Sequence, residues 1–180
     1  MGVHKLKAIE RPALFNKLFF SEGLECSSYE NSHGTGFYKV FNRRSKESYQ
    51  LSRNSVFLTP YECIAWRASS SRQKNRNKGF GECYPRGGRE DFIANLKPFP
   101  EVCPLIGVPL VYERVILPRI QKGKFGQKYD HSPSIDRIDN TKGYSNDNIR
   151  IVSWLANKAK GEMSLKQFYS MAEYMVEHKD

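Results

Sequence analysis

Two short stretches with alternating apolar and polar residues predict paired β-strands in the first third of the chain. Residues 36–41 (GFYKVF) and 48–51 (SYQL) both alternate with a period of two, and basic residues separate them. This pattern favours a hairpin or a small antiparallel sheet. Residues 59–62 (TPYE) then carry the signals of a helix start, with Thr59 as N-cap and Glu62 closing a capping box.

The pattern is clearest in the C-terminal third, where two strands and a helix are predicted in succession. Residues 132–139 and 148–152 are the predicted strands, and the stretch between them is rich in Asn, Asp, Gly and Ser, which favour turns. Ser153 is the predicted N-cap of a short helix over residues 154–160, and Gly161 ends that helix. The predicted order is therefore β, β, α.

Two further helices complete the predicted secondary structure. Residues 89–96 fit a short helix that ends at the proline-containing stretch 97–100, which we interpret as a hinge between two halves of the chain. Residues 164–167 (SLKQ) form a capping box, and apolar residues recur at helical spacing after it: Leu165, Phe168, Ala172, Met175 and Val176. This last helix is interpreted as a packing element. We expect an α+β fold, with a small sheet and helix over residues 1–97 and a ββα unit with a C-terminal helix over residues 98–180.

The charge of the chain points to a polyanionic partner. Its 29 Lys and Arg residues outnumber 19 Asp and Glu residues, and the formal net charge of +10 makes nucleic acid the leading candidate. The densest positive stretch runs from residue 67 to residue 89, with Glu82 as its one acidic residue. We interpret it as a segment that contacts a phosphate backbone, and a solvated charged loop is the alternative. Its basic residues are Arg67, Arg72, Lys74, Arg76, Lys78, Arg86 and Arg89.

The cysteines show no zinc-binding spacing. None of the four forms a Cys-x-x-Cys pair with another; they are Cys26, Cys63, Cys83 and Cys103. Reduced thiols are the expectation, and convergence of all four on one structural zinc ion is the alternative left open. The N-terminal residues lack the apolar core of a signal peptide, and no stretch approaches about 18 apolar residues. We therefore expect a cytoplasmic protein without a membrane segment.

Two residues of the ββα stretch suit a metal site. The predicted order places Asp136 on the first strand and Asn157 on the helix packed over the hairpin, so that their oxygen atoms can converge on one cation. A carboxylate and an amide carbonyl, with positions open for water and phosphate, suit one Mg²⁺ or Mn²⁺ ion better than zinc. Such an ion would polarise a phosphate and stabilise the leaving oxygen. Taken singly, each residue also fits an ordinary turn or helix surface.

Residues 132–161 resemble the HNH, or ββα-metal, nuclease family, especially its phage-type free-standing and homing endonucleases. The resemblance rests on the succession Asp-Arg-Ile-Asp, Gly-Tyr, Asn, Asn and Lys, and a looser likeness extends upstream to residues 103–110. It implies that Asp136 and Asn157 are metal ligands. It also implies that Asn148 ties the loop between the strands to the hairpin by bonds from its side chain to the backbone.

One position departs from the commoner pattern of the family, which has Asp-His where this chain has Asp136 and Arg137. Arginine cannot act as a base at neutral pH, and the resemblance to the Arg-bearing nucleases implies that Arg137 holds the scissile phosphate. Another group must then activate water. His131 is the nearest histidine and the candidate base, with Tyr129 and Tyr144 as weaker alternatives. Three more basic residues are either contacts to flanking phosphates or, equally well, solvated surface: Arg150, Lys158 and Lys160.

The resemblance implies a metal-dependent endonuclease that hydrolyses phosphodiester bonds in double-stranded DNA, by nicking or by cutting both strands. A homing role in a bacterium or a phage-infected host is expected; a restriction endonuclease is the alternative, and a neighbouring methyltransferase gene would indicate it. Outside the enzyme class, the alternative is a non-catalytic nucleic-acid-binding module on an HNH scaffold, which would bind with steep salt dependence and without cutting. Monomer and homodimer are both open.

Overall fold

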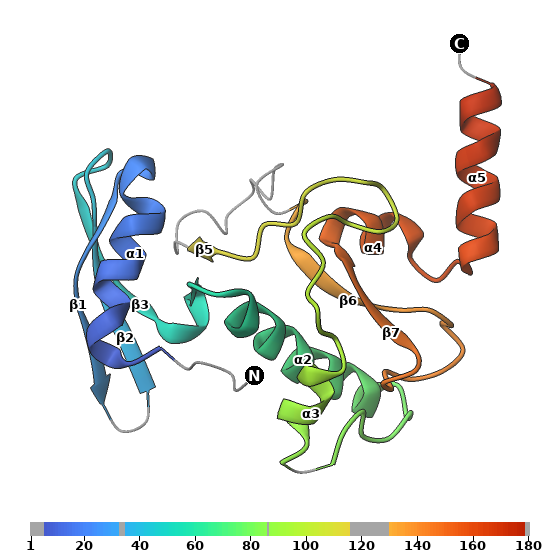
Figure 1. Cartoon of the computed structure of the whole chain (residues 1–180), viewed down its shortest axis with the longest axis horizontal. Coiled ribbons are helices and arrows are strands. Elements are labelled where there is room, and N and C mark those ends of the chain that lie inside the picture. Colours follow the sequence, from blue (N-terminus) through green and yellow to red (C-terminus); the bar gives the residue numbers. More distant parts are fainter. Residues whose placement is uncertain (1–5, 33–34, 86, 116–129, 179–180) are drawn as a thin grey trace. The chain divides into compact units, whose positions relative to one another are not determined.

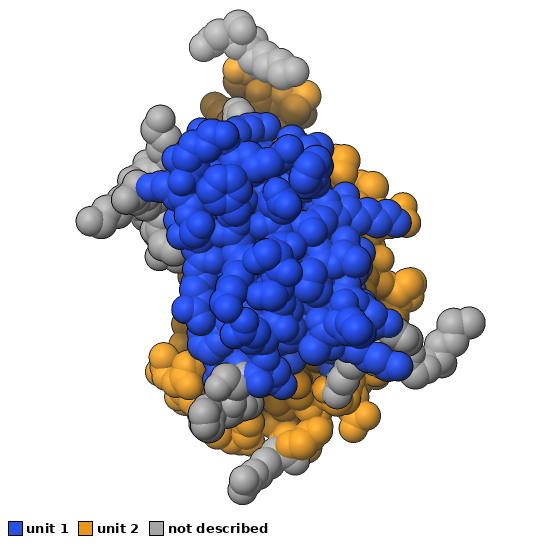
Figure 2. Space-filling view, turned by 90° about the vertical axis from the view of Figure 1, so that its left-hand side faces the viewer, with its two compact units in different colours: residues 1–63, 112–125 blue, residues 64–111, 126–180 orange. Residues whose placement is uncertain are grey.

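The computed structural model describes residues 6–32, 35–85, 87–115 and 130–178. It has the expected α+β fold, built from helices and small antiparallel sheets (Figure 1). The chain divides into two compact units (Figure 2): unit 1 contains Met1–Cys63 and Tyr112–Phe125, and unit 2 contains Ile64–Val111 and Gly126–Asp180. This division differs from the predicted boundary at residue 97, because residues 64–97 group with the ββα segment rather than with the N-terminal sheet.

Unit 1 is a helix packed on one face of a three-stranded antiparallel sheet with the order β1-β2-β3. Its elements are α1 (Arg11–Phe19), β1 (Leu24–Ser32), β2 (Thr35–Asn42), β3 (Glu47–Ser52), and the short pair β4 (Val56–Phe57) and β5 (Arg114–Val115). The hairpin predicted from the two alternating stretches is therefore confirmed as β2 and β3. Tyr38 and Val40 alternate along β2 with more exposed neighbours and share one core with α1 residues Phe15 and Phe19.

A buried ion pair connects elements within unit 1. Arg11 on α1 is 2% exposed, and its guanidinium donates to the Tyr38 hydroxyl and to the carboxylate of Glu62. α2 (Pro60–Asn77) starts at the predicted N-cap, since the Thr59 hydroxyl accepts the N–H of Glu62 at 3.3 Å. The Glu62 carboxylate reaches one residue further back than a capping box requires, and it accepts the N–H of Leu58 at 3.0 Å. Glu62 thus ties the start of α2 to α1.

Unit 2 contains the predicted ββα succession. Besides most of α2, its elements are α3 (Arg89–Ala94), β6 (Pro133–Arg137), β7 (Ile149–Ser153), α4 (Trp154–Lys160) and α5 (Leu165–Glu177). β6 and β7 form an antiparallel hairpin in which Asp136 lies opposite Arg150. The predicted short helix after residue 89 is confirmed as α3, two residues shorter than expected at its C-terminal end.

The C-terminal helix forms as predicted but is not covered. α5 has the expected capping box, in which Ser164 and Gln167 exchange side-chain and backbone hydrogen bonds. Phe168 is its buried residue, whereas the other apolar residues of its last two turns are 40–64% exposed: Met171, Tyr174, Met175 and Val176. The interpretation of α5 as a packing helix is therefore wrong for most of its length among the described residues. No described helix is long and apolar enough to cross a membrane.

Candidate functional site

The hairpin β6–β7 leads directly into helix α4 (Figure 1), and hydrogen bonds hold the junction. Ser153 ends β7 and caps α4, because its hydroxyl accepts the N–H of Ala156 at 3.1 Å. The N–H groups of Trp154 and Leu155 donate to the carbonyls of Ser132 and Asp130, just before β6. α4 therefore begins in contact with the start of the first strand, and Gly161 follows its last residue with a positive φ of 54°.

Asn148 holds the loop between the strands (residues 138–148). It is 4% exposed, its Oδ1 accepts the N–H of Asp139 at 2.8 Å, and its Nδ2 donates to the carbonyls of Asp139 at 2.9 Å and Gly143 at 2.8 Å. These are bonds from side chain to backbone across the loop, the kind that the HNH resemblance implies for this residue. They fix the chain immediately after Asp136 and Arg137.

The same loop is anchored to α2. Asn75, itself 2% exposed, accepts the N–H of Tyr144 at 2.8 Å and donates to its carbonyl at 3.2 Å. Gly143 permits this approach, because a Cβ at that position would lie 2.8 Å from the Cβ of Phe80 and 3.0 Å from Asn75 Oδ1. Sequence patterns did not indicate Asn75, since an asparagine within a polar helix has no signal for a partner so distant in sequence.

Asp136 lies in the middle of a charged cluster. It is 2% exposed; its Oδ2 accepts from Arg150 Nε at 3.1 Å and Nη2 at 2.9 Å, and its Oδ1 accepts from Lys160 Nζ at 3.1 Å. Arg150 comes from the opposite position on β7, and Lys160 from the last turn of α4. Two cations therefore face one carboxylate.

Asn157 lies on the same side of the hairpin as Asp136. Its Nδ2 donates to the Ser134 hydroxyl at 2.8 Å and to the Ile135 carbonyl at 3.3 Å. Ser134 and Asp136 share a face of β6, because side chains two residues apart on a strand point the same way. With Nδ2 turned toward the strand, Oδ1 is the atom of Asn157 with which it could coordinate a cation.

Lys160 differs from its predicted role as a phosphate contact. The side chain is fully buried, and its ammonium donates to three oxygens: Asp136 Oδ1 at 3.1 Å, the Arg137 carbonyl at 3.1 Å and Asn140 Oδ1 at 3.3 Å. A surface phosphate cannot reach an ammonium with no exposed area. The physical reason is helical spacing, since Lys160 is three residues after Asn157 and shares its face of α4.

These contacts decide how well the site fits a divalent cation. Carboxylate and amide oxygens are suitable ligands, but Mg²⁺ usually keeps several water molecules and needs open space around its ligands. Asp136 is 2% exposed, and Arg150 and Lys160 engage both of its oxygens. Among the described residues, no group of three or more His, Cys, Asp or Glu side chains could hold a metal. The arrangement of Asp136 and Asn157 therefore does not fit the Mg²⁺ or Mn²⁺ ion expected from the sequence.

Arg137 also differs from its predicted role. It is 6% exposed, and Nη1 donates to the carbonyls of Asn140 at 2.9 Å and Lys142 at 3.0 Å, while Nη2 binds Glu162 at 3.2 Å. Its guanidinium lies 5.5 Å from the ring centre of Tyr144. Adjacent residues on a strand point to opposite faces, so Arg137 faces away from the cluster around Asp136. It braces the loop instead of presenting a free guanidinium to a phosphate.

The structure describes two of the three candidate bases, His131 and Tyr144. His131 lies in the turn before β6, five positions before Asp136 along the chain, and its carbonyl accepts the N–H of Val111 at 3.0 Å. Tyr144 is 8% exposed, and burial raises the pKa of its hydroxyl. Tyr129 lies outside the described residues.

Several of the predicted DNA-contacting residues share one face of α2. Arg67 and Lys74 are seven residues apart on the helix, and Lys78 follows its last residue, with its N–H still donating to the Lys74 carbonyl at 3.1 Å, so the three lie on the same side. Desolvation lowers the pKa of the Lys74 ammonium, and nearby cations lower it further: Arg67, Arg137 and Lys78. Lys78 also binds Glu162 at 3.1 Å. Arg137 binds the same Glu162 carboxyl group at 3.2 Å, so this basic face adjoins the hairpin within unit 2.

The other predicted contacts that the structure describes each have a partner nearby. Arg72 and Arg76, one turn apart, both bind Glu82, which lowers the pKa of that carboxyl. Arg89 lies 3.5 Å from Glu90, and Lys158 lies over the ring of Trp154 at 5.0 Å. Arg86 lies outside the described residues.

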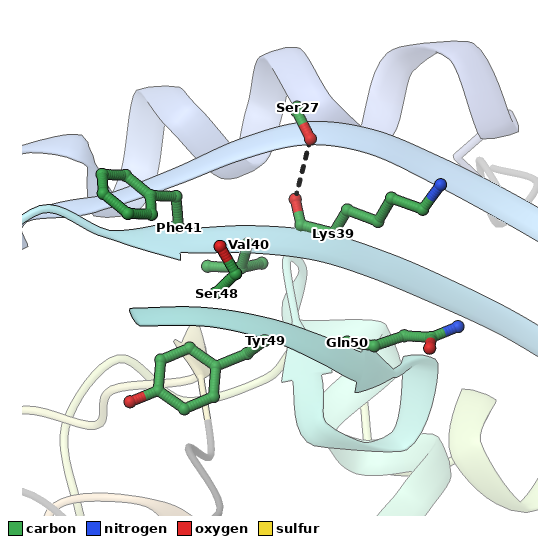
Figure 3. Close-up of a pocket in the computed structure, with 7 residues that line it drawn as sticks. All are labelled: Ser27, Lys39, Val40, Phe41, Ser48, Tyr49 and Gln50. Carbon is green, nitrogen blue, oxygen red and sulfur yellow. Dashed lines mark hydrogen bonds between the residues drawn. The ribbon is translucent and has the colours of Figure 1, made fainter. Parts of the chain in front are cut away.

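Neither the cysteines nor a pocket on unit 1 provides a second centre within the described part of the chain. No disulfide joins any of the four cysteines, all of which lie within the described residues, and Cys103 Sγ accepts the N–H of Ser153 at 3.2 Å. The pocket, of about 370 Å³, lies on the three-stranded sheet (Figure 3). It is lined by Ser27, Lys39, Val40, Phe41, Ser48, Tyr49 and Gln50, so it has neither a carboxylate nor an imidazole.

Comparison with known proteins gives no family assignment: no protein-family model, curated protein or solved structure matches this chain. The likeness of residues 132–161 to HNH nucleases therefore rests on the residues themselves and on the hairpin–helix order that they form.

Proposed function

We propose that this chain is a DNA endonuclease of the HNH type, with β6, β7 and α4 as its phosphodiester-cleaving centre. The supporting observation is the hairpin–helix unit that brings Asp136, Arg150 and Asn157 to one side of the hairpin. Asn148 holds the adjoining loop by three hydrogen bonds. The residue types and their order are those that carry the resemblance to HNH nucleases.

Double-stranded DNA is the proposed substrate because of the charge beside this centre. The chain has a net charge of +10, and the basic face of α2 formed by Arg67, Lys74 and Lys78 adjoins the hairpin. Lysine and arginine side chains on such a face gain affinity by releasing counterions from the phosphate backbone. Arg67 and Lys74 would contact phosphates that flank the one being cleaved.

Arg150 is the cation of the cluster best placed to meet a phosphate. Its side chain is 19% exposed, whereas Lys160 is fully buried. Asp136 holds the Arg150 guanidinium through two hydrogen bonds, so it orients a group that can stabilise negative charge developing on a phosphate. Because a divalent ion does not fit beside Asp136, the proposal assigns no step to a bound metal.

A second candidate function is supported by the same cluster. Both oxygens of Asp136 are engaged by protein cations, and Arg137 is buried in the loop, so the unit also suits a nucleic-acid-binding module that does not cleave. Such a module would use the hairpin and α4 as a scaffold and the basic face of α2 for binding.

A plasmid assay distinguishes the two functions. Supercoiled plasmid is incubated with wild type, Asp136→Asn and the exposed loop control Lys142→Ala, with Mg²⁺, with Mn²⁺ and with EDTA. An endonuclease gives nicked or linear plasmid with wild type and Lys142→Ala, and intact plasmid with a folded Asp136→Asn. If folded wild type binds duplex DNA yet leaves the plasmid supercoiled in all three buffers, the endonuclease proposal is refuted and the non-cleaving binding module is supported.

A further inference from the structure

The ammonium of Lys160 is held as a bound cation would be. A lysine ammonium has three N–H donors and no acceptor. Here each donor has an oxygen partner, in Asp136, the Arg137 carbonyl and the Asn140 side chain, at 3.1, 3.1 and 3.3 Å. With Lys160 fully buried, these oxygens form a closed cage around the charge. They are hard oxygen donors, the type that divalent cations such as Mg²⁺, Mn²⁺ and Ca²⁺ also take.

The cage is itself fixed by the chain around it. Asn140 donates through Nδ2 to the carbonyls of Gly161 at 3.2 Å and Met163 at 3.0 Å, just after α4, which turns its Oδ1 toward Lys160. On the other side, Arg150 binds the second oxygen of Asp136. The position of the ammonium is thus determined by contacts from the loop, from β6 and from the chain that follows α4.

Displacing this ammonium would be costly. A divalent ion on Asp136 would have to separate Lys160 from the carboxylate to which its ammonium is hydrogen-bonded, and it would leave a fully buried ammonium without that ion pair. Breaking a buried ion pair in this way is strongly unfavourable. The incoming ion would also face the Arg150 guanidinium, which carries the same sign of charge.

We infer that Lys160 is a tethered cation that takes the place of the divalent ion, so that this ββα centre binds no Mg²⁺ or Mn²⁺ at Asp136. The inference rests on the proposed function only in that it identifies Asp136 with the cation position of an HNH centre. Its consequence is that removing the ammonium should free an oxygen cage that a metal can enter.

Mn²⁺ titration without DNA tests this inference, with free Mn²⁺ measured by electron paramagnetic resonance. The proteins are wild type, Lys160→Ala, the double variant Lys160→Ala/Asp136→Asn, and Lys166→Ala, which removes the same charge from an exposed position on α5. Wild type and Lys166→Ala should leave Mn²⁺ free. Lys160→Ala should bind it at least about tenfold more tightly than wild type, and the double variant should lose that gain.

Two results would overturn the inference: one Mn²⁺ bound per wild-type chain with loss of that binding in Asp136→Asn, or a folded Lys160→Ala with no gain over wild type. If Lys160→Ala does not fold, the wild type alone tests the inference. Its thermal unfolding midpoint should be the same in Mn²⁺ and in EDTA. A higher midpoint in Mn²⁺ that Asp136→Asn abolishes would refute the inference. Cleavage is not part of these measurements. If the protein does not cleave plasmid, the nuclease proposal fails but the inference about Lys160 can still hold. If it nicks plasmid with Mn²⁺ bound at Asp136, the nuclease proposal holds and the inference about Lys160 is wrong.

Discussion

Replacing Asn148 by alanine should destabilise unit 2 by about 3 kcal/mol. The side chain is 4% exposed and makes three hydrogen bonds of 2.8–2.9 Å to backbone groups of Asp139 and Gly143. A lost hydrogen bond that leaves a buried partner unpaired costs about 1 kcal/mol, and three of them give the sum. Urea unfolding followed by tryptophan fluorescence measures the loss, because Trp66 and Trp154 both belong to unit 2.

The matched control is Asn146→Ala, an exposed residue of the same loop, which should change the free energy of unfolding by less than about 0.5 kcal/mol. Asn148→Asp is the sharper variant. It keeps the acceptor for Asp139 N–H but sets a carboxylate oxygen against two carbonyls, so it should be less stable than Asn148→Ala at neutral pH. If Asn148→Ala is as stable as Asn146→Ala, the loop does not depend on this side chain, and the assignment of Asn148 as its anchor is refuted.

Three further predictions concern both units. Arg11→Ala should cost about 3 kcal/mol in urea unfolding, since it leaves the Glu62 carboxylate without its buried partner; a change below about 1 kcal/mol would contradict this. Gly143→Ala should cost about 1–3 kcal/mol, because its Cβ would meet Phe80 at 2.8 Å, and an unchanged midpoint would show that the loop can move aside. Burial raises the pKa of Tyr38 to about 12, above the usual value of about 10. The neutral phenol is therefore favoured in the folded state, so the stability that it contributes is present below pH ~10 and lost as the pH rises toward 12; tyrosinate absorbance that reaches its full amplitude in the native protein by pH ~10 would contradict it.

The ββα order could be predicted because its signals are local. Ser153 and Gly161 mark the two ends of α4, and the strands on either side of the polar loop have their own apolar pattern. β1 gave no such signal, and the structure shows why: a register shift between Cys26 and Ser28 interrupts the alternation along the strand. The apolar spacing of α5 predicted a helix correctly but contained no information on whether anything covers it.

The charges of the site could not be predicted from residue types alone. A sequence shows that Asp136 is followed by Arg137, but only the pleat of β6 turns one side chain to the α4 side and the other to the loop. Lysine is a residue type that usually lies at the protein surface, and the burial of Lys160 depends on how α4 is rotated over the hairpin. The spacing of Asn157 and Lys160 on one helix face was the available signal for their shared surroundings.

The rate of plasmid nicking under single-turnover conditions, with protein in excess, tests the central proposal most directly. Wild type should convert supercoiled plasmid to nicked or linear product. Asp136→Asn, with its circular dichroism and its affinity for the same plasmid retained, should be slower by about 100-fold or more, the loss typical when a group that stabilises developing charge is no longer held in place. Equal rates for the two proteins, or a folded wild type that binds the plasmid and never nicks it, would contradict an endonuclease centred on Asp136.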